Sequence, residues 1–532
     1  MASPRPISAT TATDVLVLGG GPAAVWAALA AAKAGVRVVL ADKGYCGTSG
    51  ATAAANTHVW DLPAGQDRDG EVERRLTRAT GLAERDWLVR VMEQATRGLD
   101  DLAGSGFPFP VQGDGAQYRG QLRGPDYMSF MRRRILLAGV TILDHHPGLE
   151  LLSADGVVAG AICLNVRSGQ LHCIKAGAVV IATGGCTFLS RALGCDGNTG
   201  DGYLMGVEAG ARLSAMEFSG QYGISPSHSS VTKGMPYGFA TLTLEDGQPL
   251  PINSEKDRFE AIASAMISGH TVYARLDRAT DEEQIWLRKG QPNCFLPFDR
   301  IGINPFTQRF SITLRSEGTV RGVGGLLLDT EDCATTAPGL YAAGDAASRE
   351  RIVGSSSGGG RPNAAWAIAS GSWSGGGAAR FARSLGNSID DRQASPLGHA
   401  GLRPQQRTAA DDFSREATQA VREEILPLDM GFYRDGMRIA TSLKRLNLLW
   451  DDIKNHLTAQ GPRLIRAREA AAMTATARWI WTSTLHRPES RGLNRRTDHP
   501  ALNRELTRSI ILSEVDTPRV RAGDLKIQGV AA

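Results

Sequence analysis

Residues 14–24, DVLVLGGGPAA, contain the pattern that predicts the class of fold. Its four apolar residues are typical of a buried strand, and they run directly into three glycines. An alanine-rich segment that continues to Lys33 predicts a helix, which Gly35 ends. Apart from Arg37, residues 36–40 are again apolar and include three β-branched valines, and this second strand stops at Asp42. The order strand, glycine turn, helix, strand predicts a βαβ unit of a parallel sheet.

The glycine turn has the spacing of a dinucleotide-binding loop. Gly19 permits a tight turn, Gly21 lets the backbone approach a pyrophosphate, and the small Ala24 lets the helix pack on the strand. The pyrophosphate would then lie at the positive end of the helix. Asp42 is placed to accept hydrogen bonds from a ribose, and its charge disfavours a 2′-phosphate. The alternative for Asp42 is a solvated carboxylate at a strand end.

Two later strand ends favour FAD over a nicotinamide cofactor. Residues 182–185 and 343–345 each carry glycine after an apolar strand, and the second adds an acid suited to ribitol hydroxyls. A long, two-part cofactor needs such close backbone approach at distant points of the chain. Because the sequence has one convincing fingerprint, we expect no second domain for a nicotinamide. Electrons would enter from a substrate, a protein or a quinone.

Composition excludes several classes of protein. The 532 residues are 42% hydrophobic, enough for about three globular units, and a formal charge of +4 is too dilute for nucleic-acid binding. The seven cysteines have no metal-ligand spacing, so we expect free thiols, a reducing compartment and no metal. The amino-terminal residues do not read as a signal peptide, and no apolar stretch reaches the ~20 residues that span a bilayer. We therefore expect a cytoplasmic protein without a membrane span.

Further motifs occur in a fixed order along the chain. They are residues 14–43, SGATAA at 49–54, residues 181–185, NTGDG at 198–202, AGA at 209–211, MEF at 216–218, the glycine pair 324–325, residues 340–345, and ESRG at 489–492 followed by Arg496 and residues 498–500. In this set the chain resembles the flavoprotein subunits of fumarate reductase and succinate dehydrogenase, a family that includes L-aspartate oxidase and the adenylylsulfate reductase α subunit.

The resemblance implies an α/β fold of three parts. An FAD-binding, Rossmann-like domain of the glutathione-reductase type would be split by an inserted α+β cap and followed by a helical domain. The expected boundaries are 1–225 and 323–385 for the FAD domain, 226–322 for the cap, 386–409 for a linker, and 410–532 for the helical domain. We expect the last residues, after about 512, to be irregular.

The motifs and the resemblance together imply a set of cofactor-binding residues. These are Gly19, Gly21, Pro22, Ala23, Ala24, Asp42, Lys43, Thr48, Ser49, Gly50, Ala51, Thr52, Ala182, Thr183, Gly184, Asp201, Gly344, Asp345, Asn363 and Ala364. Membrane-bound members of the family carry FAD on a histidine near the second strand end, where this chain has residues 48–51, TSGA. Non-covalent FAD is therefore expected.

The chain departs from the family where a dicarboxylate would bind. Residues 219–223 lack the histidine that follows the MEF-like segment, and Val320 and Arg321 stand where a second histidine is usual. Serine and glycine replace the arginine of the loop at 354–360, and Arg361 lies nearby. These departures argue against fumarate or succinate as the substrate.

Three residues are candidates for catalysis. The family uses a cap arginine as proton donor, and the matching segment here is Lys256-Asp257-Arg258, with Lys256 the first choice and Arg258 the second. The alternative is a pair of charges at a solvated helix start. Arg361 would add positive charge beside the flavin N1/O2 edge or bind a substrate carboxylate or sulfate, unless it is a surface arginine.

For the other charged residues shared with the family, the sequence leaves two roles open. Glu217 shapes the substrate chamber or forms an ion pair of the cap. Arg491 and Arg496 reach the rim of the active site or, as we expect, form structural ion pairs.

The expected activity is hydride transfer between flavin N5 and a small polar or anionic organic substrate, with reduction or desaturation of a double bond. One alternative is sulfur redox chemistry like that of the adenylylsulfate reductase α subunit, with an iron–sulfur partner. Another is a non-catalytic FAD subunit that relays electrons. The expected partners are thus a small-molecule substrate and, for these alternatives, an iron–sulfur or other electron-transfer protein.

Overall fold

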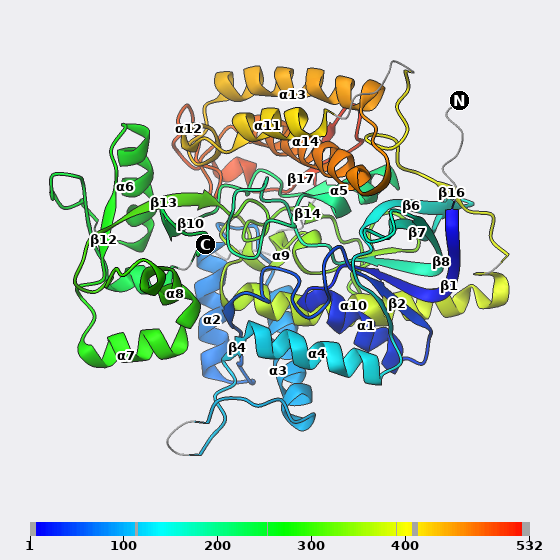
Figure 1. Cartoon of the computed structure of the whole chain (residues 1–532), viewed down its shortest axis with the longest axis horizontal. Helices are drawn as coiled ribbons and strands as arrows, with labels where there is room; N and C mark the ends of the chain where they lie inside the picture. The colour runs from blue at the N-terminus through cyan, green and yellow to red at the C-terminus, as the bar shows by residue number, and fades with distance from the viewer. Residues whose placement is uncertain are drawn as a thin grey trace.

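The computed structural model describes residues 7–111, 115–232, 234–252, 254–389, 391–406 and 413–523. Its main sheet has eight strands in the order β16-β6-β7-β8-β1-β2-β5, with β15 also paired to β8 (Figure 1). The strands of this sheet are β1 (Ile7–Leu18), β2 (Val38–Ala41), β5 (Thr141–Leu143), β6 (Gly148–Ala154), β7 (Val157–Leu164), β8 (Leu171–Ile181), β15 (Leu340–Ala342) and β16 (Ser395–Pro396).

The predicted βαβ unit is confirmed. β1 pairs in parallel with β2, Val15 opposite Val38, and α1 (Pro22–Lys33) connects them. β6, β7 and β8 form an antiparallel meander, after which β8 lies parallel to β1. Since β15 is also parallel to β8, the carboxyl ends of β1, β2, β8 and β15 meet at one edge. Such an edge is where open α/β sheets bind their ligands.

Close helix packing holds this edge in place. α10 (Arg361–Ser384) lies against α1. A Cβ atom at Gly371 would lie 2.5 Å from the carbonyl oxygen of Ala23, and one at Gly375 would lie 2.1 Å from that of Ala27. The two glycines therefore let the helix backbones touch, and both helices begin at the sheet edge. The outer helices of this domain are α2 (Gln66–Arg78), α3 (Arg85–Gly104), α4 (Gly124–Leu137), α5 (Asp201–Glu208) and α9 (Glu350–Val353), with a short ribbon of β3 (Asn56–His58) and β4 (Gln121–Arg123).

The segment expected to form the cap is a four-stranded antiparallel sheet of order β10-β13-β12-β11, drawn in green in Figure 1. It has a hydrophobic cluster of its own, separate from the core of the main sheet. Its elements are β10 (Tyr222–Pro226), η1 (Met235–Phe239), β11 (Thr241–Thr243), α6 (Glu255–Ile267), β12 (Tyr273–Arg275), α7 (Asp281–Gly290), α8 (Pro292–Arg300) and β13 (Phe310–Ser316).

The carboxy-terminal part packs four helices over the main domain (Figure 1). They are α11 (Ser414–Ile425), α12 (Leu428–Gly431), α13 (Gly436–His456) and α14 (Leu464–Leu485). Every residue of α14 from Ala470 to Thr484 is buried, so this helix is the core of its domain. None of the described helices is both long and apolar enough to cross a membrane.

The expectation of an irregular tail is wrong for the residues up to 523, and residues 524–532 lie outside the described part of the chain. β17 (Ile510–Ser513) and β18 (Arg519–Ala522) form a hairpin, and β17 pairs with β9 (Leu213–Ser214), which in turn pairs with β14 (Gly325–Leu326). Ile510 and Leu512 are buried on this sheet, while β18 is largely exposed. The tail becomes ordered because β9, from the FAD domain, offers it an edge, and nothing in its own short sequence reveals that edge.

Candidate functional site

A cavity of about 760 Å³ opens at the carboxyl edge of the main sheet. The first turns of α1 and α10 border it, and Met235 and Gln291 of the cap segment also line it. All the predicted cofactor-binding residues line this cavity except Ala24 and Thr48. Ala24 is fully buried behind the wall, and Thr48 is exposed. The fold thus brings together residues that lie more than 300 positions apart in the sequence.

The glycine loop leaves room for a ligand backbone only because it lacks side chains. Gly19 has φ +121°, and a Cβ atom there would lie 2.3 Å from the carbonyl oxygen of Ala182. A Cβ atom at Gly20 would lie 2.3 Å from Oδ2 of Asp42. α1 has no side-chain cap at its Gly21 end, so the first turn of this helix presents its N–H groups to the cavity. This arrangement suits a pyrophosphate.

Polar atoms around the cavity have unused hydrogen-bonding capacity. Asp42 is 4% exposed, and its Oδ2 atom accepts no hydrogen bond from the described residues. Burial raises the pKa of this carboxyl, which Ser49 and the backbone of Gly44 partly oppose. Thr183 Oγ1 and Asn363 Oδ1 are also buried without a partner among those residues. Buried polar groups are normally paired, so these atoms fit the ribose and ribitol hydroxyls of FAD.

The other end of the cavity is built on two arginines and two acids. Arg349 is buried, pairs with Asp345, and donates to the carbonyl oxygens of Thr319 and Gly322 at 2.8 and 2.6 Å. Burial raises the pKa of Asp345, and the nearby guanidinium of Arg349 opposes that shift. Arg321 lines the cavity, and its Nη1 lies 2.8 Å from Oε1 of Glu317.

Arg321 faces the cavity and Glu317 stands behind it. The Arg321 side chain is 29% exposed against 2% for Glu317. The Glu317 charge raises the pKa of Arg321, so the guanidinium stays protonated. Sequence reasoning noted Arg321 as a departure from the family and did not place it at the site. The signal was available, because Val320 and Arg321 stand where the family usually carries a histidine.

Of the predicted catalytic residues whose side chains the structure describes, neither Arg258 nor Arg361 lines the cavity. Arg361 is exposed at the first residue of α10, whereas Gly360, Asn363 and Ala364 of the same turn face the cavity. Lys256 and Arg258 lie at the start of α6, and the Lys256 side chain is outside the described part of the structure. Their catalytic roles stay predictions. Among the described residues, no cluster of three His, Cys, Asp or Glu side chains could hold a metal ion.

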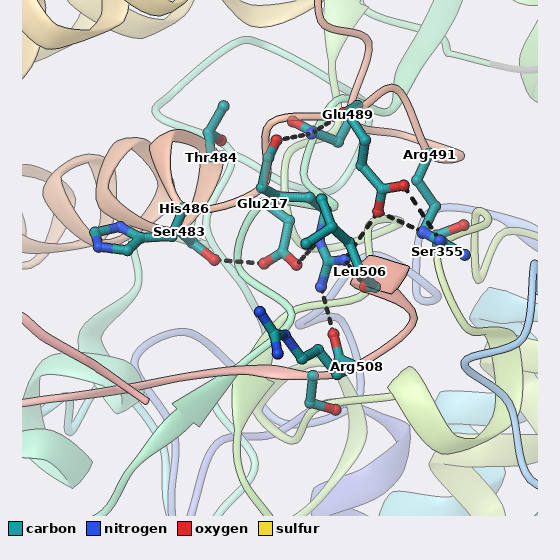
Figure 2. Close-up of polar contacts among 12 residues, drawn as sticks. Glu217, Ser355, Ser483, Thr484, His486, Glu489, Arg491, Leu506 and Arg508 are labelled. Atoms are coloured by element: carbon teal, nitrogen blue, oxygen red, sulfur yellow. Dashed lines mark hydrogen bonds and ion pairs between the residues drawn. The ribbon is translucent and has the colours of Figure 1, made fainter. Parts of the chain in front are cut away.

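A buried ion network, outside the lining of the cavity, connects residues 217 and 483–508 (Figure 2). Glu217 accepts hydrogen bonds from Ser483 and from Nε of Arg487, the latter at 2.6 Å. Glu489 accepts from Nη1 of Arg487 at 3.1 Å and from Nε of Arg491 at 2.6 Å. All four charged side chains are at most 1% exposed.

This network corrects one expectation and confirms another. Glu217 is bound to the segment after α14, so it belongs to the interface of the FAD and helical domains and neither lines the cavity nor pairs within the cap. Arg491 pairs with Glu489, and Arg496 pairs with Asp498 at 2.7 Å. The expectation that both arginines form structural ion pairs is confirmed.

Comparison with known proteins agrees with this site. The family model of the FAD binding domain matches residues 14–221, and that of the fumarate reductase flavoprotein carboxy-terminal domain matches residues 423–530. The chain is an FAD-dependent oxidoreductase of the fumarate reductase and aspartate oxidase family. FAD is its cofactor, as the residues around the cavity indicate.

The relatives of this flavoprotein are similar over their full length. It is 26% identical to an L-aspartate oxidase of Mycobacterium bovis, over 95% of this chain and 96% of the relative. It is 25% identical to a fumarate reductase flavoprotein subunit of Mycobacterium tuberculosis, over 92% and 93%. Among solved structures, the E. coli quinol fumarate reductase FrdA chain matches with a TM-score of 0.82 at 21% identity, over 98% of both chains. These relatives differ in activity, so they do not identify the substrate.

Proposed function

We propose that this flavoprotein transfers hydride between FAD and a small anionic organic substrate, by reduction or desaturation of a double bond. The observation that carries the proposal is Arg321, whose guanidinium lines the cavity while Glu317 lies behind it. When bound, the flavin supplies hydride chemistry at N5. The protein must then hold the substrate, exclude water and move a proton.

Arg321 is suited to the first of these tasks. A guanidinium binds a carboxylate through two parallel hydrogen bonds, which fixes both position and orientation. The 2.8 Å contact between Nη1 of Arg321 and Oε1 of Glu317 holds one side of the guanidinium, and the Arg321 side chain also lines the cavity. The first turn of α10 adds the positive end of a helix dipole on the same wall. An anionic group is therefore favoured at this end of the cavity.

The proposed substrate is not fumarate or succinate. Arg321 stands beside the position of a family histidine, and the loop at 354–360 lacks the family arginine. The family binds a dicarboxylate with two histidines and an arginine, and this chain has the single guanidinium of Arg321 instead. This difference favours a substrate with one anionic group close to the reacting carbons. Lys256, with Arg258 as the second choice, remains the proposed proton donor, and Arg361 the proposed electrostatic support of the flavin.

The test uses the purified holoenzyme. It is mixed anaerobically with a panel of saturated and unsaturated monocarboxylates, dicarboxylates and amino acids, and flavin absorbance is followed in both directions. With the best substrate, Arg321→Met should raise KM by about 10- to 100-fold, the loss of a charge-assisted contact. Arg300→Met is the control, because Arg300 is exposed at the end of α8 in the cap.

Several outcomes contradict the proposal. Unchanged kcat/KM in Arg321→Met, with unchanged FAD content, would exclude Arg321 from substrate binding. Flavin that reacts with sulfite or an adenylylated sulfate and with no carbon substrate would favour sulfur chemistry. Reduction by an iron–sulfur protein alone would favour the electron-relay alternative.

We also propose that FAD is bound without a covalent bond, because residues 48–51 carry no histidine. Acid precipitation of the holoenzyme should leave the flavin in the supernatant. Flavin in the pellet would contradict the proposal and would make His58, which lines the cavity, the candidate for the covalent bond to FAD.

A further inference from the structure

A second hollow adjoins the cofactor cavity and plays no part in the function proposed above. It is a groove of about 720 Å³ between α11, the first turn of α14 and the loop that follows Leu189. We call it the basic groove, after Arg191, Arg422, Arg463 and Arg466 on its walls. Glu469 also lines it, and it meets the cofactor cavity at Lys43 and Asp196, which line both hollows. We propose that the basic groove binds a phosphate-bearing small molecule.

The charge of the basic groove is concentrated and unbalanced. Five basic and two acidic side chains line it, so its walls carry a net charge of +3, against +4 for the entire chain. One of the acids, Glu469, is already held by Lys43 at 2.7 Å. None of the four arginines forms an ion pair with a described residue, although most other arginines of the chain do. The groove therefore lacks the anions that would balance it.

Two of the arginines lie at the N-terminal end of α14, where a positive charge destabilises the helix. Arg463 is the residue before α14, and Arg466 lies in its first turn, which contains no acidic residue. The N-terminus of a helix carries partial positive charge, so cations there are destabilising and anions stabilising. A bound anion would offset the repulsion of both guanidinium groups.

The other two arginines come from separate elements and converge on the same space. Arg422 projects from α11, and its Nε atom is buried without a hydrogen-bond partner among the described residues. Arg191 has φ +63°, a left-handed conformation that is uncommon for a residue other than glycine. Strained backbone and unpartnered donors are typical of ligand sites.

The walls indicate the class of ligand. Guanidinium groups match phosphate oxygens through paired hydrogen bonds. Val166, Leu189 and Ile465 add an apolar wall on which a ring or chain can lie. A volume within the usual range for small-molecule sites, three surplus positive charges and this apolar wall fit a nucleotide or a similar ester with at least two negative charges.

The experiment measures binding of ADP and of inorganic pyrophosphate to the FAD-loaded enzyme by calorimetry at low salt. The variant is Arg463→Glu combined with Arg466→Glu, and Arg300→Glu, at an exposed arginine of the cap, is the matched control. We expect both probes to bind the wild type and the control alike, and the double variant at least about tenfold more weakly. ADP should bind more tightly than pyrophosphate because it also contacts the apolar wall.

The flavin spectrum and FAD content keep the two sites distinct. Both should stay unchanged in the double variant, since neither arginine lines the cofactor cavity. The proposal is overturned if neither probe binds at millimolar concentration, if the double variant binds as tightly as the wild type, or if ADP releases FAD and so occupies the cofactor cavity. Binding of an acidic protein without either phosphate probe would assign the groove to protein docking and also overturn it.

Discussion

The cofactor cavity and the ion network both contain buried polar atoms, but the hydrogen bonding of these atoms differs between them. Around the cavity, Asp42 Oδ2, Thr183 Oγ1 and Asn363 Oδ1 have no partner among the described residues. In the network, each carboxylate of Glu217 and Glu489 is held by at least one arginine. Unpaired buried polar atoms indicate a site where a ligand supplies the missing hydrogen bonds. Complete pairing indicates that the ion network has a structural role.

The largest effect on stability is expected from a substitution that breaks the buried ion network. Arg487→Met would leave Glu217 buried without its cation and remove hydrogen bonds to the carbonyl oxygens of Leu506 and Arg508. Loss of one partner of a buried pair costs about 3–5 kcal/mol. Urea unfolding of the holoenzyme measures this loss. A loss below about 1 kcal/mol would mean that the network does not hold the two domains together.

Glu350 is a buried acid that lacks the complete pairing of Glu217 and Glu489. It lies beside the network, with one carboxylate oxygen held by Ser509 at 2.6 Å and the other without a partner among the described residues. Burial, and then the negative charge of Glu217, raise its pKa from 4.5 to about 7. The folded protein therefore holds this proton more tightly than the unfolded chain does.

Stability should thus fall as pH rises from 4.5 to about 7, by up to about 3 kcal/mol from Glu350 alone. Glu350→Gln removes this dependence. The free energy of unfolding, measured at several pH values across that window for both proteins, should decline less steeply in the variant. Parallel curves would show that Glu350 is ionised without penalty.

Asp42→Asn should separate ligand binding from stability. We expect FAD affinity to fall by about 10- to 100-fold, because a charged acceptor for the ribose hydroxyls is lost. The stability of the protein freed of FAD should stay the same or rise, since a buried charge with one unpartnered oxygen is removed. Flavin fluorescence titration and urea unfolding give the two values, with Glu282→Gln, at an exposed acid of α7, as the control. A loss of stability without FAD would place Asp42 with the structural residues.

The smallest effect is expected at the surface. Arg438 lies 2.6 Å from Asp429, a spacing like that of the buried pairs, but the two side chains are 50% and 42% exposed. Exposed ion pairs contribute about 0–1 kcal/mol, so Arg438→Ala should barely change urea unfolding. A cost as large as that of Arg487→Met would show that burial is not what distinguishes the network.

Local patterns in the sequence predicted the glycine-rich strand ends and Asp42 of the candidate cofactor site, and the resemblance to the family added others, among them Asn363. Gly19, Gly21 and Asp42 lie within one βαβ unit, whose geometry follows from the periodicity of its strands and helix. The partners of Glu217 were not predictable in this way. Arg487 lies 270 residues further along the chain, and no spacing rule connects them. The order of the tail likewise depends on β9, some 300 residues earlier.

By itself, the sequence determined the class of fold and the cofactor, because phosphate binding and strand–helix packing impose short-range rules on glycines and apolar residues. Tertiary structure decided which charges are structural and which face a ligand. The sequence alone does not distinguish Arg321, Arg463 and Arg487. In the folded chain Arg321 lines the cofactor cavity and Arg463 lines the basic groove. Arg487 is buried and paired with Glu217 between two domains. The physical reason is that the free energy of a charge depends on its solvation and its neighbours, which only the folded chain supplies.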